Sequence, residues 1–62
     1  MGILNEQERE RVNNCLYDIN DKLKAIDLEM KRDKQYKSYL TEKIESALWD
    51  MQVIKHICQE EK

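Results

Sequence analysis

Proline is absent from this 62-residue chain, and glycine occurs once, at position 2. Because these residues make most tight turns, their scarcity argues against sheet-rich and turn-rich folds. Phenylalanine is absent as well. A single small domain of 62 residues buries a smaller share of its surface than a large domain does. Proteins this small usually need a covalent staple or a partner to become stable.

Long apolar runs are also missing. No stretch approaches the roughly 18 residues of a membrane span, and the N-terminus lacks the apolar segment of a signal peptide. We therefore expect an intracellular, cytoplasmic protein that makes no membrane contact. Charge of one sign is not in excess either, since 11 basic and 13 acidic side chains give a net charge of −2. That balance argues against a general affinity for polyanions.

Patterns that carry catalysis or bind metals are scarce. His56 is the only histidine, and Cys15 and Cys58 do not complete a four-ligand zinc set. A single glycine cannot form a phosphate-binding loop, and no serine has a base placed beside it by local spacing. We predict that the protein is not an enzyme and has no cofactor or metal. Both thiols are expected to be reduced, although antiparallel helices would bring them within about one turn of each other.

What the chain does contain is a heptad pattern, running from Val12 to Cys58. If Val12 is a d position, the d residues are Val12, Ile19, Ile26, Asp33, Leu40, Ala47 and Ile54. The a residues are then Leu16, Leu23, Met30, Lys37, Ile44, Met51 and Cys58. All but Asp33 and Lys37 are apolar, and spacings that alternate between four and three are typical of helices packed on helices. The sequence predicts an all-α protein in which these twelve apolar residues form an oligomer core.

A helix start is marked near the N-terminus. Asn5 is a suitable N-cap, and Glu8 stands three residues later, which is the spacing of a capping box. We predict an N-terminal cap segment over residues 1–5 and a single helical oligomerisation module over residues 6–61. The helix is expected to fray near residues 59–62.

The segment 31–39 leaves the topology open. In one interpretation the chain is a single heptad-repeat helix of roughly 84 Å that forms a coiled coil or a helical bundle. In the alternative it is an antiparallel two-helix hairpin that turns near residues 33–37 and dimerises into a four-helix bundle. Asp33 and Lys37 are either the loop or a polar layer that fixes register and orientation.

Three observations favour the straight helix. No glycine or proline marks a turn, and the heptad positions continue through the segment without a shift. The third is that three g-to-e pairs of a parallel assembly are attractive and none is repulsive: Lys22 with Asp27, Glu29 with Lys34, and Asp50 with Lys55.

Antiparallel pairing explains the pattern almost as well. When residues whose numbers sum to 70 face each other, all six resulting layers of a and d residues are apolar. The flanking g positions then pair Lys22 with Asp50 and Glu29 with Lys43, both attractively. In parallel coiled coils, leucine at a with isoleucine at d favours assemblies of four helices. This rule transfers poorly to antiparallel coiled coils. Dimer and tetramer therefore both stay open.

The second half of the chain carries more apolar residues than one seam needs. Tyr39, Trp49, Val53 and Ile57 lie within about an 80° arc of a helix, away from the a and d positions. The plainer explanation is that they pack inside a bundle of three or four helices. The functional explanation is a docking face for another protein, since tryptophan and tyrosine often anchor interfaces.

These patterns predict a structural or interaction protein, which oligomerises through its heptads and docks a partner protein. Its partners would be other copies of itself and a second protein. The alternative is a small helical-bundle regulator that binds RNA or DNA through a lysine patch at residues 22–43. A third possibility is that the chain is a dimerising part of a longer filamentous protein.

Overall fold

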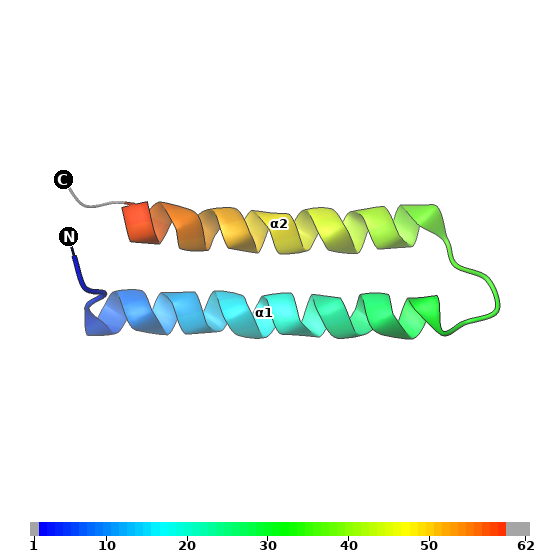
Figure 1. Ribbon diagram of the computed structural model, residues 1–62, viewed down its shortest axis with the longest axis horizontal. Coiled ribbons are helices and arrows are strands. Elements are labelled where there is room, and N and C mark those ends of the chain that lie inside the picture. The colour runs from blue at the N-terminus through cyan, green and yellow to red at the C-terminus, as the bar shows by residue number, and fades with distance from the viewer. Residues whose placement is uncertain (1, 60–62) are drawn as a thin grey trace.

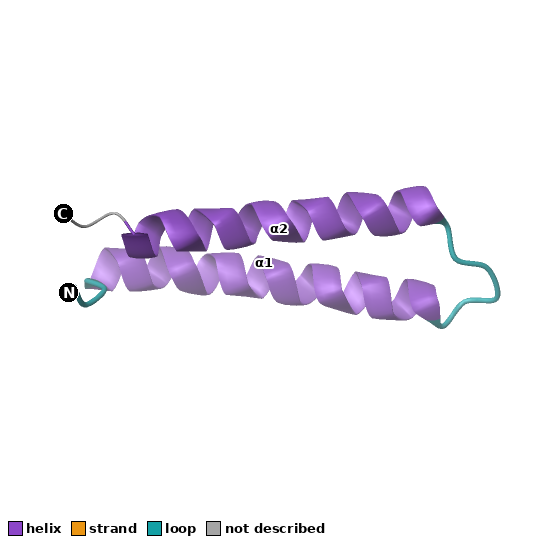
Figure 2. Ribbon diagram, turned by 45° about the horizontal axis from the view of Figure 1, so that its top comes forward, coloured by secondary structure: helices purple, strands orange, loops and turns teal. Residues whose placement is uncertain are grey.

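A computed structural model describes residues 2–59, which form two helices and the loop between them. Helix α1 spans Glu6–Met30 and helix α2 spans Lys37–Gln59. The helices lie side by side and run in opposite directions, so the start of α1 and the end of α2 are at one end of a hairpin (Figures 1 and 2). The all-α prediction is confirmed. Residues 60–62, where the helix was expected to fray, lie outside the described residues, as does Met1.

Helix α1 begins where the sequence predicts. The Asn5 side chain accepts a hydrogen bond from the backbone N–H of Glu8 at 2.8 Å. In return the Glu8 carboxylate accepts one from the backbone N–H of Asn5 at 3.0 Å. This capping box satisfies two backbone donors that a helix start otherwise leaves unpaired.

The connection over residues 31–36 is held by polar side chains. The Glu29 carboxylate accepts a hydrogen bond from the backbone N–H of Tyr36 at 2.9 Å, directly before α2 begins. The Gln35 side-chain amide donates to the backbone carbonyl of Met30 at 3.2 Å and also to that of Arg32. These bonds satisfy backbone groups at the end of α1 and the start of α2.

The preference for one uninterrupted helix was wrong, and the hairpin alternative is what the structure shows. No residue in the described range has a positive φ angle, so this turn does not require glycine. Asp33 lies in the loop, as the hairpin interpretation predicts, whereas Lys37, which was also expected in the loop, is the first residue of α2. Absence of glycine and proline therefore did not exclude a turn built from ordinary helical and extended conformations.

The seam between α1 and α2 is centred on the d and g positions. Ile19, Ala47 and Ile57 are the buried apolar residues of the described chain. Half-buried d residues extend the seam in both directions: Val12, Ile26, Leu40 and Ile54. Lys22 and Asp50, both at g, meet across it at 3.0 Å. This is the g-to-g pair that antiparallel packing predicts.

The hairpin by itself is thin and exposed. It measures 48 × 17 × 13 Å, and its accessible surface is 5443 Å². A compact monomer of this 7.5 kDa mass is expected to expose roughly 4,200 Å². The hairpin therefore exposes more surface than a compact monomer of the same mass.

Candidate interaction surfaces

The twelve predicted core residues divide into two groups. The d residues line the seam of the hairpin, whereas the a residues remain exposed. Because the g positions of α1 and α2 face each other, and a lies on the other side of d from g, the a residues of both helices share one flank. The residues predicted to form one oligomer core therefore form two surfaces. The d residues lie inside the hairpin, and the a residues lie on its outside.

We name the exposed flank the a stripe. It consists of Leu16, Leu23, Met30, Ile44, Met51 and Cys58, with Leu48 beside them at an e position. Its six large side chains are each between 46% and 56% exposed. These residues recur every seven positions on each helix and share one flank, so the stripe is a row of half-exposed apolar side chains along the hairpin.

An ion cluster lies at two of the g positions of the seam. Lys22 contacts Asp50 of the opposite helix and Asp18 of its own helix. The Lys22 and Asp50 side chains are only 18% and 14% exposed. The hydrogen bond from Lys22 lowers the pKa of Asp18, and the hydrogen bond to Asp18, followed by that to Asp50, raises the pKa of Lys22. The cluster fixes which flanks of the helices face each other.

We expect this cluster to make stability depend on pH at both extremes. Its contribution is lost as pH falls from the ordinary aspartate value of 3.8 through the lowered pKa of Asp18. It is also lost as pH rises from 10.5 through the raised pKa of Lys22. Thermal unfolding followed by circular dichroism should show that Lys22→Met destabilises the hairpin near neutral pH but much less at either extreme. A difference between the two proteins that stays constant across pH would contradict the role of the cluster.

The predicted docking residues do not all lie on an accessible surface. Ile57 is 3% exposed and belongs to the hairpin seam, so it is not available to a partner of the folded hairpin. Trp49 is 69% exposed, Tyr39 is 37% exposed and Val53 is half-buried. The ammonium of Lys43 lies 5.3 Å from the centre of the Tyr39 ring, at cation–π distance.

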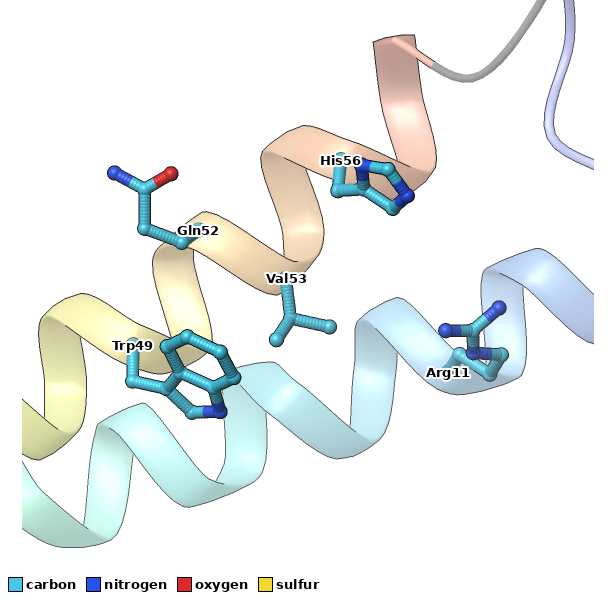
Figure 3. Close-up of a pocket in the computed structure, with 5 residues that line it drawn as sticks. All are labelled: Arg11, Trp49, Gln52, Val53 and His56. Carbon is cyan, nitrogen blue, oxygen red and sulfur yellow. The ribbon is translucent and has the colours of Figure 1, made fainter.

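Trp49 and Val53 contribute to a groove on the flank opposite the a stripe. The groove encloses about 380 Å³ and is lined by Arg11, Trp49, Gln52, Val53 and His56. Trp49 and Val53 extend towards α1, Arg11 comes from α1, and Gln52 points away from α1 (Figure 3). We call these five residues the Trp49 groove. Arg11, Gln52 and His56 were not predicted, because their heptad positions identify only outward-facing polar residues.

Several basic residues of the segment 22–43 are already paired within the hairpin. Lys31 lies 3.0 Å from Asp27, and Arg32 lies 3.4 Å from the buried carboxylate of Glu29. Lys22 is held in the ion cluster, and Lys43 lies over Tyr39. Of the seven basic residues, three have no such contact with a residue in the range 2–59: Lys24, Lys34 and Lys37.

Other kinds of site are not formed by the described residues. Within residues 2–59 no group of three histidine, cysteine, aspartate or glutamate side chains is placed to hold a metal ion. Cys15 and Cys58 are both free thiols. None of the described helices combines the length and apolar character that crossing a membrane requires.

Comparison with family models, with curated proteins and with solved structures found no match for this chain. Any assignment of function therefore rests on the residues and surfaces described above.

Proposed function

We propose that this protein is an assembly module, in which two hairpins pair through their a stripes to form a four-helix bundle. The observation that carries this proposal is the a stripe itself, an apolar face that two helices build together and that the hairpin leaves uncovered. The opposite flank, with the Trp49 groove, would remain accessible in such a bundle and could receive another protein. Pairing through the a residues would also complete the oligomer core expected from the heptads.

The energetic gain from covering the stripe is large for so small a protein. Fully burying one aliphatic side chain contributes about 1.5–3 kcal/mol, so burying the exposed halves of six contributes about 5–9 kcal/mol per chain. Two chains contribute twice, against an association cost of about 4–15 kcal/mol. The hairpin seam has three buried apolar residues within the described range, and a seam that small gives marginal stability alone.

The composition around the stripe suits a second copy of the same chain. Its edges carry neutral polar residues such as Asn13, Asn20 and Thr41, which do not oppose pairing with an identical surface. The charged edge residues are Asp27, near the end of α1 beside the loop, and Lys55, near the end of α2 away from the loop. Antiparallel pairing of two hairpins would bring Asp27 and Lys55 to the same end, whereas parallel pairing would place Asp27 near Asp27.

Methionine methyl groups offer a direct test, because Met30 and Met51 both lie on the stripe. We expect a dissolved paramagnetic probe to broaden both methyl NMR signals strongly in dilute protein. The broadening should weaken as the protein concentration rises and second copies cover the stripe. Signals that remain equally accessible at all concentrations would contradict self-association through this face.

Nucleic-acid binding is the second candidate, and the loop favours it. Lys31, Arg32, Lys34 and Lys37 are grouped there beside Tyr36, whose side chain is 58% exposed. If this group binds RNA or DNA, titration with a single-stranded oligonucleotide should give an affinity that falls steeply with salt. The slope of log K against log salt concentration should be about −0.7 for each phosphate contact. Binding that is absent at low salt, or insensitive to salt, would remove this candidate. It is the weaker one, because Lys31 and Arg32 already have carboxylate partners.

A further inference from the structure

The Trp49 groove combines apolar contact area with cationic and hydrogen-bonding groups. Trp49 and Val53 supply the apolar part, and the indole ring of Trp49 is mostly exposed. Arg11 on α1 and His56 on α2 both line the groove at the end away from Trp49 (Figure 3). No carboxylate lines it, and Arg11 forms no ion pair with a described residue.

This chemistry selects a ligand with two different ends. Indole and aliphatic surfaces bury an apolar side chain, and exposed tryptophan is a frequent anchor of protein interfaces. A guanidinium group is always charged near neutral pH and binds carboxylates through paired hydrogen bonds. A purely apolar ligand would give the Arg11 guanidinium no anionic partner. A purely anionic ligand would leave the Trp49 ring exposed to water.

We propose that the Trp49 groove binds a peptide segment of a partner protein that places an apolar side chain against Trp49 and Val53 and a carboxylate at Arg11 and His56. This inference rests on the partner-docking part of the proposed function, but it does not depend on self-association. The groove and the a stripe lie on opposite flanks of the hairpin, so a bundle and a monomer would both offer the groove.

The geometry sets the spacing within the ligand. Trp49 and His56 are seven residues apart on α2, which corresponds to about 10.5 Å along the helix. Side chains of an extended peptide alternate between its two faces, so residues i and i+4 point to the same side and lie about 13 Å apart. This is the shortest same-face spacing that covers the distance, and a suitable probe is therefore a capped pentapeptide of sequence leucine–alanine–alanine–alanine–glutamate. The matched control is the same peptide with glutamine in place of glutamate.

Trp49 is the only tryptophan of the chain, so its fluorescence reports directly on the groove. Titration at low salt should change the Trp49 emission, with the glutamate peptide binding roughly tenfold more tightly than the glutamine peptide. Arg11→Gln should abolish most of this difference. Arg9→Gln removes the same charge from the same helical turn at an a position, on the other flank, and should preserve it.

Equal binding of the two peptides, or no change in emission with either, would overturn the proposal. So would an Arg11→Gln variant that still prefers the glutamate peptide. Trp49 emission that shifts when the protein is concentrated without peptide would mean that a second copy occupies the groove, which also overturns it. The molar mass of the protein, measured in parallel, reports on self-association alone. It therefore separates a failure of peptide binding from a failure of self-association.

Discussion

Leu23→Asp should convert the assembled protein into a monomer. Leu23 lies in the middle of the a stripe and is 53% exposed, so the hairpin seam tolerates a change there. In the proposed bundle, however, the new carboxylate would be buried between two apolar faces without a partner, which costs several kcal/mol per chain. Each antiparallel pair would contain two such charges. We expect the dissociation constant to rise by about 1,000-fold or more, measured by sedimentation equilibrium.

Leu28→Asp is the matched control for this experiment. Leu28 belongs to the same helix and is 65% exposed, but it occupies an f position away from the a stripe. The same substitution there should leave both the helix content and the molar mass unchanged. If both variants dissociate equally, or if neither does, the a stripe is not the assembly surface.

Glu29→Ala should have the second largest effect, because it removes the contact that holds the turn. The Glu29 side chain is 3% exposed and accepts hydrogen bonds from the backbone of Tyr36 and from Arg32. Loss of a charged hydrogen-bond acceptor from such a site costs about 1.5–3 kcal/mol. We expect a decrease of that size in the free energy of unfolding, measured by urea denaturation.

The same substitution should also favour an extended form. The heptad positions continue through residues 31–36, so a chain without the Glu29 contact could form one straight helix and exchange its halves with a second copy. Small-angle scattering would then detect particles of about 80 Å in place of the 48 Å hairpin. Glu45→Ala removes an exposed carboxylate from α2 and serves as the control. A Glu29→Ala protein with unchanged stability and unchanged length would contradict the role assigned to the turn contacts.

The sequence predicted those features that depend on periodicity and on local hydrogen bonding. Asn5 and Glu8 form the expected capping box, and α1 begins at the expected residue. Antiparallel pairing predicted the contact between Lys22 and Asp50, because g positions face each other in that arrangement. The d residues, which the heptads predict as part of an oligomer core, line the seam between the two helices of one chain.

The turn and the division of the heptad face could not be predicted in the same way. The turn depends on Glu29 and Gln35 reaching across the loop, and the local sequence is equally compatible with helix. The heptad pattern marks a and d as apolar without saying which of them faces the other helix of the hairpin. Ile57 shows the consequence, since its place beside Trp49 and Val53 on the helix wheel did not reveal that it is buried in the seam.

The molar mass of the unmodified protein, measured by light scattering over a wide concentration range together with small-angle scattering, tests the central claim most directly. We predict a species of twice the 7.5 kDa chain mass whose long dimension remains close to that of one hairpin, as expected for two hairpins packed side by side. A particle of one chain mass at every concentration would contradict the claim that a second copy covers the a stripe.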